Sequence, residues 1–462
     1  MRRHIVALLI LILLGQSLSN LNSYNYNNDS LDNTNNVEST QKSNATLTLT
    51  DIDSPNVLDI FVSGFNSCFT NFENEFYCWG KGDYGLLGTM ITSDTPNPIL
   101  INLGYETVVQ HSSFSGHACA LTDLNSVYCW GDNSFGRLGI GTTSTQTYYN
   151  PSLVDFGVGR YAIEISLGTR HSCALLDNHY VSCWGSGQGG LIGNGYSNGG
   201  TYSSPVNVTI IPNGLTVNSI SAGESHTCAI LSDDSIICWG ETIMSNTQGI
   251  RYFFPSNNPP VSISSGRSFV CATMFNGSLN CWGENEDGQL GINSTVDKNT
   301  PHYVDLGQGI TVNSISIEYR HVCAILSDNS LKCWGANTQG NLGTGDTVNR
   351  LVPSEIEIPK GRILKSVQTG IWHSCVLFED SSIDCFGRNV ETELGIPNSG
   401  IKTSISNDIN RINTPDYTSE ITENKYVNLT LRSPKVEVFP LNDYQYNIDL
   451  PNGLNFNNST FI

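Results

Sequence analysis

The chain has 462 residues, of which 22 are Lys or Arg and 42 are Asp or Glu, so its formal net charge is −20. Because nucleic-acid binding needs basic side chains that neutralise phosphates, this balance excludes DNA or RNA as the main partner. Hydrophobic residues make up 39% of the chain, enough for a substantial core, which excludes wholesale disorder. The 44 glycines and only 4 methionines favour turn-rich β structure over helices.

The first segment has the three parts of a secretory signal peptide. Met1–His4 carries two arginines, Ile5–Leu14 is an apolar run, and small residues stand at Ser17 and Ser19. The apolar run is short for a membrane span, although an uncleaved anchor is the alternative interpretation. We expect residues 1–19 to be a signal peptide and the protein to be secreted or held at the cell surface, without a transmembrane segment after cleavage.

The next segment, residues 20–56, is rich in Asn, Ser and Thr. Such a composition buries too little apolar surface to become ordered, so we expect a flexible stalk. At the other end of the chain, residues 398–462 are predicted to be a linker and a short β-rich tail of unknown role. Within this tail, Tyr426–Leu431 and Lys435–Phe439 alternate between apolar and polar residues, as strands do.

Between these ends, residues 57–397 are repetitive. All 14 cysteines fall into seven pairs whose members are ten positions apart. The second cysteine begins Cys-Trp-Gly in six repeats and Cys-Phe-Gly, with Phe386, in the seventh. The pairs are Cys68 and Cys78, Cys119 and Cys129, Cys173 and Cys183, Cys228 and Cys238, Cys271 and Cys281, Cys323 and Cys333, and Cys375 and Cys385.

Each repeat has the pattern of short strands joined by turns. Cys228–Leu231 and Ile236–Trp239, for example, flank the polar turn Ser232–Ser235. The midpoint of each cysteine pair is a single residue, such as Asp233, so a hairpin with an odd-length loop sets the two cysteines directly opposite each other. At a non-hydrogen-bonded pair they are close enough for a cross-strand disulfide. We predict seven structural disulfides; metal binding is the alternative, but this spacing lacks the short Cys-x2–4-Cys of zinc sites.

Seven repeats with a period near 51 residues, each holding three or four short strands, predict an all-β fold, a seven-bladed β-propeller. One such unit cannot bury both of its faces alone, whereas a closed ring of seven can. The predicted organisation is therefore a stalk, a propeller over residues 57–397, and a tail.

The repeat resembles that of the regulator-of-chromosome-condensation repeat family. The family's Gly-x-x-His stands here at Gly223–His226, and its Trp-Gly-x-Asn-x-x-Gly-x-Leu-Gly at Trp282–Gly291. The resemblance covers residues 57–397, about three-quarters of the chain. It implies a seven-bladed propeller, in which the N-terminal segment Leu58–Ser63 closes the ring by joining the sheet of the last blade.

Members of this family differ in what they do. The nuclear members exchange nucleotide on a small GTPase, whereas the secreted bacterial members include a propeller that inhibits β-lactamases through loops on one face. This chain departs from the nuclear type in its signal peptide, its acidity and its cysteine pairs, which argues against guanine-nucleotide exchange. The secreted propellers are the better comparison, and they imply a binding module that recognises an extracellular or surface protein.

The loops between the strands carry aromatic side chains beside Ser, Gly and Asn, a composition typical of adaptable binding surfaces. We expect blades one to four to share one partner-binding face, although packing against neighbouring blades is an alternative role for these rings. The predicted partner-binding residues are Tyr84, Phe135, Tyr148, Tyr149, Tyr196, Tyr202, Tyr252 and Phe253.

Evidence for catalysis or metal binding is weak in the sequence. It contains no Gly-x-Ser-x-Gly, no His-Glu-x-x-His and no phosphate loop, and Asp51–Asp53 and Asn285–Gly288 only faintly resemble calcium loops. We therefore predict no enzyme activity, no cofactor and no metal site; a carbohydrate-binding or hydrolytic propeller is the alternative. Five equivalent histidines are predicted to form structural hydrogen bonds rather than a ring of metal ligands: His117, His171, His226, His321 and His373.

The motif Asn-x-Ser/Thr, the acceptor of N-glycosylation, recurs along the chain. Because the chain is rich in Asn, some matches are expected by chance, and the motif alone is weak evidence for glycans. The matching asparagines are Asn28, Asn44, Asn207, Asn276, Asn293, Asn428, Asn457 and Asn458.

Overall fold

The computed structural model of the chain describes residues 57–241, 249–397 and 400–405. The predicted signal peptide, the predicted stalk and the two strand-like segments of the tail lie outside these residues. The described residues form β-strands joined by loops, with two single-turn 3₁₀ helices, Asp83–Gly85 (η1) and Ser134–Gly136 (η2). In this part of the chain, no helix has the length and apolar character that crossing a bilayer requires.

The strands form seven antiparallel sheets of four, and each sheet uses four strands that are consecutive in the chain. Within each blade they are lettered A to D in chain order. The first three blades contain β1 (Val57–Ser63), β2 (Asn66–Asn71), β3 (Phe76–Gly80) and β4 (Thr95–Ile101); β5 (Val108–Phe114), β6 (His117–Thr122), β7 (Val127–Asp132) and β8 (Thr147–Leu153); and β9 (Ala162–Leu167), β10 (His171–Leu176), β11 (Val181–Gln188) and β12 (Asn198–Asn207).

The same order holds in the other four blades. They contain β13 (Val217–Ala222), β14 (His226–Leu231), β15 (Ile236–Gly240) and β16 (Ile250–Tyr252); β17 (Pro260–Ser265), β18 (Phe269–Met274), β19 (Leu279–Gly283) and β20 (Lys298–Val304); β21 (Val312–Glu318), β22 (His321–Leu326), β23 (Leu331–Gly335) and β24 (Arg350–Ile356); and β25 (Leu364–Thr369), β26 (His373–Phe378), β27 (Ile383–Asn389) and β28 (Gly400–Lys402).

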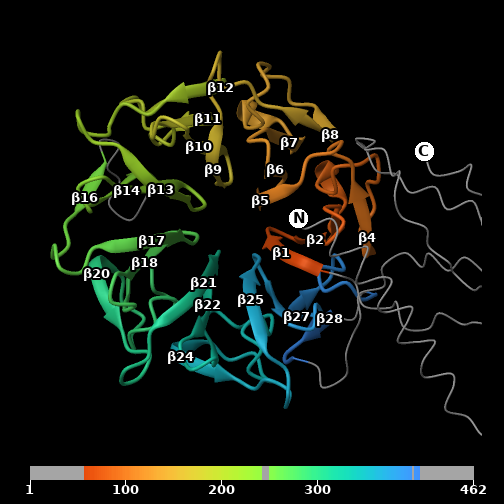
Figure 1. The fold of residues 1–462 in the computed structure, drawn as a ribbon, viewed down its shortest axis with the longest axis vertical. Coiled ribbons are helices and arrows are strands. Elements are labelled where there is room, and N and C mark those ends of the chain that lie inside the picture. Colours follow the sequence, from red (N-terminus) through yellow and green to blue (C-terminus); the bar gives the residue numbers. More distant parts are fainter. Residues whose placement is uncertain (1–56, 242–248, 398–399, 406–462) are drawn as a thin grey trace, which may run out of the picture. The chain divides into compact units, whose positions relative to one another are not determined.

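The seven sheets are arranged in a ring with strand A of each blade innermost (Figure 1). Each strand A packs against strand A of the next blade, and β25 packs against β1, which closes the ring. The predicted seven-bladed propeller is confirmed. The expectation that Leu58–Ser63 joins the sheet of the last blade is wrong, because this segment lies in β1 and pairs with β2. The first and last blades are instead joined by hydrogen bonds such as those from Lys365 Nζ to the Leu58 carbonyl, 2.7 Å long, and from the Ile371 N–H to the Gly64 carbonyl, 2.9 Å long.

The last blade extends beyond residue 397, where the sequence predicted the linker to begin. Its strand D is β28, and Ile405 behind it is buried in the core between blades six and seven. A bridge between Thr344 and Ser404 attaches this end of the chain to blade six. The segment was expected to be linker because it lacks the cysteines and the Trp-Gly motif that mark the other strands.

All seven predicted disulfides are present. In every blade the two cysteines lie directly opposite each other on strands B and C, and their Cα atoms are 4.0–4.2 Å apart. This spacing fits non-hydrogen-bonded pairs, at which antiparallel strands approach most closely. All fourteen cysteines are buried, so the disulfides join the two middle strands of each sheet inside the core. The bonds join Cys68 to Cys78, Cys119 to Cys129, Cys173 to Cys183, Cys228 to Cys238, Cys271 to Cys281, Cys323 to Cys333 and Cys375 to Cys385.

The tryptophan after the second cysteine joins neighbouring blades. Trp184 is fully buried, and its Nε1 donates a hydrogen bond of 2.9 Å to the Arg137 carbonyl in the preceding blade. A Cβ atom at Gly139 would lie 2.7 Å from that Nε1, which explains the glycine in the repeat. Phe386 takes the place of the tryptophan in blade seven and has no N–H to donate. The equivalent bond is made by Trp79, Trp130, Trp239 and Trp334.

The ring has two faces with different loops. Since consecutive strands are antiparallel, the A–B and C–D connections lie at one end of every sheet, and the B–C turns and the connections between blades lie at the other. We name the first the loop face, to which Phe65 and Lys81–Asp94 belong in blade one. The second is named the turn face, to which Phe72–Glu75 and Asn102–Thr107 belong in the same blade.

Candidate interaction surface

Two of the predicted binding residues occupy an unusual backbone conformation on the loop face. Tyr84 and Phe135 have φ angles of 58° and 63°, and their side chains are 53% and 43% exposed. Bulky residues rarely adopt positive φ, whereas glycine does so freely. The equivalent residue of blade three is Gly189, with a φ of 65°. An aromatic ring held outward where glycine would fit without strain is a sign of a functional role.

The other predicted residues of blades two and three lie at the same end of their sheets. Tyr196 is 64% exposed in the loop between β11 and β12. Tyr148, Tyr149 and Tyr202 are half-buried on strands D. Tyr202 accepts a hydrogen bond of 2.8 Å at its hydroxyl from Asn194 Nδ2, and Tyr149 packs against Gly85 of blade one. The rings of Tyr148, Tyr149 and Tyr202 thus pack beside the loops, whereas the ring of Tyr196 is exposed to solvent.

The structure places the remaining two predicted residues at the opposite end of the ring. Tyr252 pairs with Ile236, at the turn-face end of blade four. Its ring is half-buried and lies 5.1 Å from that of Trp282. Phe253 follows it and is 73% exposed beside Arg251. The structure therefore does not bring Tyr252 and Phe253 together with the loop-face residues.

A continuous row of aromatic rings and cations crosses the loop face from blade five to blade one. Its members come from A–B loops, from the ends of strands C and from the first C–D loop, and most are half-buried. We name it the aromatic–cation row, and it consists of Arg267, Tyr319, Trp372, Arg388, Phe65, Lys81 and Tyr84.

The steps along this row are contacts between side chains, except the step from Trp372 to Arg388, which is a main-chain hydrogen bond. The Arg267 guanidinium lies 5.6 Å from the centre of the Tyr319 ring, and the Tyr319 and Trp372 rings are 4.9 Å apart, edge to face. The Arg388 N–H donates to the Trp372 carbonyl, and its guanidinium lies 5.6 Å from the Phe65 ring.

Lys81 continues the row, because its Nζ lies 4.9 Å from the centre of the Phe65 ring and 6.0 Å from that of Tyr84. Tyr319 also has a positive φ of 50°, so a third exposed or half-buried ring of this face has a strained backbone. The row therefore combines cations in contact with rings and rings held by strained loops.

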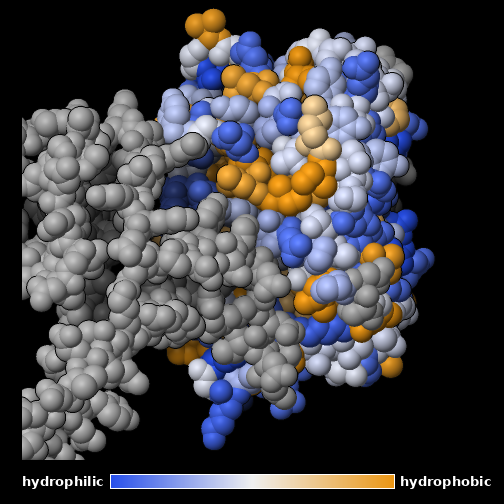
Figure 2. All heavy atoms as spheres, turned by 90° about the vertical axis from the view of Figure 1, so that its right-hand side faces the viewer, coloured by the Kyte–Doolittle hydropathy of each residue, from blue (hydrophilic) through white to orange (hydrophobic). Residues whose placement is uncertain are grey.

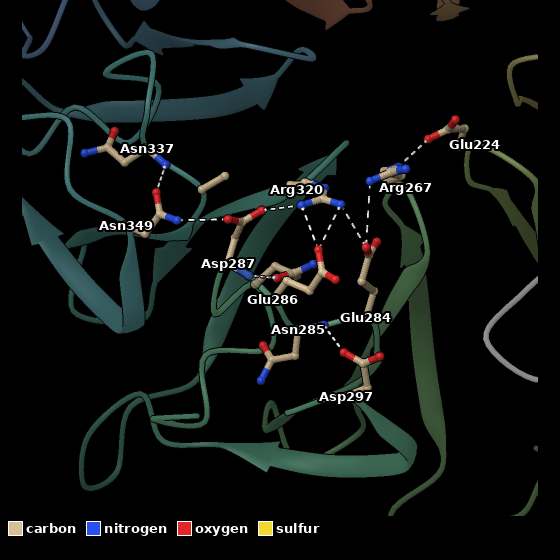
Figure 3. A network of polar contacts seen from close by, with 12 residues as sticks. Glu224, Arg267, Glu284, Asn285, Glu286, Asp287, Asp297, Arg320, Asn337 and Asn349 are labelled. Carbon is tan, nitrogen blue, oxygen red and sulfur yellow. Dashed lines mark hydrogen bonds and ion pairs between the residues drawn. The ribbon is translucent and has the colours of Figure 1, made fainter. Parts of the chain in front are cut away.

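Carboxylates beside the row hold one of its cations, Arg267, together with the neighbouring Arg320 (Figure 3). Glu284 accepts a hydrogen bond of 2.8 Å from Arg320 and lies 3.7 Å from Arg267, which also bonds Glu224 at 2.9 Å. Burial raises the pKa of Glu284, and the two guanidinium groups partly oppose this shift. Arg320 also bonds Asp287 at 2.7 Å. The loops of blades four, five and six contribute to one network, so ion pairs hold these loops in position relative to one another.

The comparisons with known proteins agree with this fold. The profile of the RCC1-like domain matches residues 25–370, three-quarters of the sequence. The chain belongs to the RCC1-like domain family. Arabidopsis thaliana ultraviolet-B receptor UVR8 is 25% identical to it over 354 residues, which cover 74% of this chain and 79% of the receptor. The Mus musculus E3 ubiquitin-protein ligase HERC2 is 25% identical over 359 residues, 74% of this chain but 6% of the ligase.

Solved structures with this RCC1-like fold include yeast RCC1 (Prp20) bound to Kap60, with a TM-score of 0.63 and 16% identity over 82% of this chain and 90% of that one. Human WBSCR16 has a TM-score of 0.62 and 20% identity, over 70% and 87% of the two chains. At these identities the likeness shows the fold alone. In the first of these structures the yeast protein is bound to a second protein, Kap60.

Sequence reasoning on this RCC1-like domain missed the aromatics of the A–B loops. Phe65, Tyr319 and Trp372 stand one or two positions before the place of the repeated histidine, in the variable part of Gly-x-x-His. Most blades carry small or charged residues there, so an aromatic at this position was the available signal. The predicted residues lie in C–D loops, on strands D or just after them, so the prediction included one end of the row, Tyr84, and not the rest.

The channel through this RCC1-like ring contains a cavity of about 210 Å³ lined largely by serines. Ser112, Ser166 and Ser221 are examples, each paired with the first cysteine of its own blade. The buried Glu318 also lines it and accepts a hydrogen bond of 2.6 Å from the Gly64 N–H. Burial raises the pKa of Glu318 well above its usual value. A cavity of this size suits water or a small polar molecule rather than a protein segment.

The outer side of the RCC1-like ring differs from the loop face in how its apolar side chains are distributed. Figure 2 shows the side that carries β4, where apolar side chains lie in separate groups among polar ones. On the outer strand β4 the exposed large apolar residue is Leu100. Scattered apolar side chains are normal on soluble proteins. The loop face, with its connected rings and cations, is the better candidate for a binding surface.

Proposed function

We propose that this protein is exported and that its loop face binds a protein partner. The signal-peptide pattern of residues 1–19 supports export. The seven disulfides support it as well, because such bonds persist in oxidising compartments and are rare in the cytosol. Protein binding is the role that RCC1-like propellers have in homologues.

The aromatic–cation row is the observation that carries the proposal. Trp, Tyr and Arg are the residues in which binding energy is concentrated at protein interfaces. In the row they stand in direct contact across three seams between blades, from Arg267 to Lys81. Because neighbouring rings and carboxylates already hold these cations, little side-chain entropy is lost when a partner binds. Tyr84 and Phe135 extend the same face into blades one and two.

The alternative functions have less support. A hydrolytic or carbohydrate-binding propeller needs free carboxylates among aromatic rings, whereas Glu284 and Asp287 of the loop face are engaged by Arg320. Guanine-nucleotide exchange belongs to intracellular members of the family, and a signal peptide does not suit that location. Protein recognition is therefore the function that the loop face supports best.

The proposal is tested with the oxidised mature protein, residues 20–462, used to capture partners from the surface and secreted fractions of its source. Trp372→Ala and Tyr84→Ala are compared with Phe72→Ala, which removes an exposed ring from the turn face of blade one. Partners of the unchanged protein are purified and their dissociation constants measured with all three variants. Trp372→Ala is expected to weaken binding at least about tenfold, the effect of a residue central to an interface.

Two results would contradict the proposal. A partner that binds the Trp372 and Tyr84 variants as tightly as the unchanged protein would place the binding surface elsewhere. Capture of polysaccharide from a protein-free extract, with no protein captured, would favour the carbohydrate-binding alternative. A loss that is equal in the Phe72 control would show that the variants act through general destabilisation.

A further inference from the structure

Three of the Asn-x-Ser/Thr motifs lie in the described residues. The structure shows the exposure of their asparagines and the hydrogen bonds of the side-chain amides, which the motif alone does not show. They begin at Asn207, Asn276 and Asn293, and all three side chains are exposed. Asn207 stands at the end of β12, Asn276 in the B–C turn of blade five, and Asn293 in the C–D loop of the same blade. Each is a place where a large substituent meets solvent.

Buried asparagines of the same loops form a natural contrast. Their Nδ2 atoms donate hydrogen bonds to main-chain carbonyls; the Asn285 Nδ2, for example, bonds the Ser294 carbonyl at 2.7 Å. A sugar on such a nitrogen would break the loop. The asparagines of this kind are Asn66, Asn133, Asn285, Asn337, Asn341 and Asn389, and none is followed two positions later by Ser or Thr.

The side-chain amides of the motif asparagines are oriented the other way. Asn276 Oδ1 accepts a hydrogen bond of 2.9 Å from the Ser278 N–H, and Asn207 Oδ1 accepts one of 3.1 Å from Ser182 Oγ. Among the described residues, nothing accepts a hydrogen bond from the Nδ2 atoms of Asn207, Asn276 or Asn293. In Asn207 and Asn276 the protein holds the oxygen, and in all three asparagines the nitrogen, the atom that N-glycosylation modifies, is left at the surface.

We propose that Asn207, Asn276 and Asn293 carry N-linked oligosaccharides. In this reaction Nδ2 forms a bond to the anomeric carbon of an oligosaccharide carried on a lipid diphosphate. The bond from that carbon to the diphosphate breaks, and the proton lost by Nδ2 leaves with the diphosphate. The lipid-linked oligosaccharide and its transferase belong to the secretory membrane, so the inference rests on the export part of the proposed function.

Two of the three sites lie away from the loop face, and the third, Asn293, lies on it but outside the blades that supply most of the aromatic–cation row. Asn276 lies on the turn face, and Asn207 pairs with Ser182 at the turn-face end of β11. Asn293 is tied to the outer strand β24 by a bond from its N–H to the Leu351 carbonyl, 2.9 Å long. Blades six, seven and one, which supply most of the row, have no motif in their described residues. The sugars at Asn207 and Asn276 would leave the loop face open, whereas the sugar at Asn293 would stand on the loop face of blade five, the blade that supplies only Arg267 to the row.

The test uses the protein isolated from the surface and secreted fractions of its own source. Its peptides are treated with a glycan-removing amidase in ¹⁸O water, which converts each glycosylated Asn to labelled Asp, and are analysed by mass spectrometry. Label is expected at Asn207, Asn276 and Asn293, and not at Asn313, an exposed asparagine followed by Ser and Ile. Ser278→Ala should abolish the label at Asn276, and Ser278→Thr should retain it.

The mature N-terminus, read from the same sample, separates the two ways in which the inference can fail. A chain that begins near Asn20 and has unlabelled Asn207, Asn276 and Asn293 overturns the glycosylation proposal and leaves export standing. A chain that keeps residues 1–19 and is recovered only from the cytosol overturns both. Label at the Asn313 control would show that the conversion arises from spontaneous deamidation.

Discussion

His117 Nε2 lies 2.9 Å from Ser172 Oγ, across the seam between blades two and three. Ser172 Oγ also donates a hydrogen bond of 2.9 Å to the Arg137 carbonyl, so its single proton is engaged. The hydroxyl must therefore accept from His117, which fixes the neutral tautomer with the proton on Nε2. Burial lowers the pKa of His117 well below its usual value, which agrees with a neutral ring. Equivalent bonds join His171 to Thr227, His321 to Ser374 and His373 to Ser67.

Ser172→Ala removes the hydroxyl that bonds both His117 and the Arg137 carbonyl. We expect the free energy of unfolding to fall by about 1–3 kcal/mol, because a buried Nε2–H is left without an acceptor and the Arg137 carbonyl loses one of its donors. Urea unfolding followed by tryptophan fluorescence measures the change. The matched control is Ser152→Ala, which alters a half-buried serine on the outer strand β8 and should have little effect. Equal stability of the Ser172 variant would show that the histidine bond is not needed.

The seam between blades four and five lacks this bond, and restoring it should stabilise the ring. Val270 takes the place of Ser172 there, and the buried His226 Nε2 has no partner among the described residues. Val270→Thr places a hydroxyl of nearly the same size beside it, as Thr227 does for His171. The free energy of unfolding should rise by about 0.5–1.5 kcal/mol, the net contribution of one hydrogen bond. His226→Phe combined with Val270→Thr should lose that gain, and a gain that survives it would rule out the hydrogen bond as the cause.

The buried histidines should make the fold sensitive to acid. Burial lowers the pKa of His171 and His321 to about 3 and that of His226 to about 4. Below pH 6.5 the unfolded chain therefore binds protons that the folded chain does not, so stability falls as the pH falls towards these values. Each histidine contributes about 1.4 kcal/mol per pH unit in this window.

Buried carboxyl groups act in the opposite direction. Burial raises the pKa of Glu164 to about 7, so between 4.5 and 7 the folded chain keeps a proton that the unfolded chain has lost, and stability falls as the pH rises. Burial also raises the pKa of Asp59, Glu284, Glu318 and Glu393, but the six buried histidines outnumber these five carboxyl groups. We expect the urea midpoint to fall from pH 6.5 to pH 4.5. A midpoint that stays level over this range would contradict the histidine assignment.

Tyr84→Gly separates binding from stability. Glycine relieves the positive φ at this position and removes the ring, so partner binding should weaken while the free energy of unfolding does not fall. Tyr84→Ala keeps the strained backbone and should be about 1 kcal/mol less stable than the glycine variant. Thermal unfolding and the dissociation constant are measured on the same samples. A glycine variant that binds as tightly as the unchanged protein would remove Tyr84 from the interface.

The sequence predicted the repeated features well because each occurs seven times. The spacing of Cys68 and Cys78 recurs in every blade. The register of the hairpin formed by strands B and C, inferred from one turn, was therefore correct for all seven blades. Tyr252 was misplaced because blade four lacks the Gly-x-Leu-Gly ending, so the path of its strand D could not be read from the motif. Phe65 is more than 300 positions before Arg388 and contacts it only where the ring closes. No local pattern marks such a contact.

Every described blade is built from one uninterrupted stretch of chain, and the ring has no strand that one blade lends to another. The seam between blades one and seven is therefore held as the other seams are, by packing and by hydrogen bonds of side chains and loops rather than by a shared strand. A cut in any connection between blades, such as Asn102–Thr107, would leave seven whole sheets, each with its own disulfide. The propeller could therefore begin and end at any of these connections. Circularly permuted chains should assemble into the same ring.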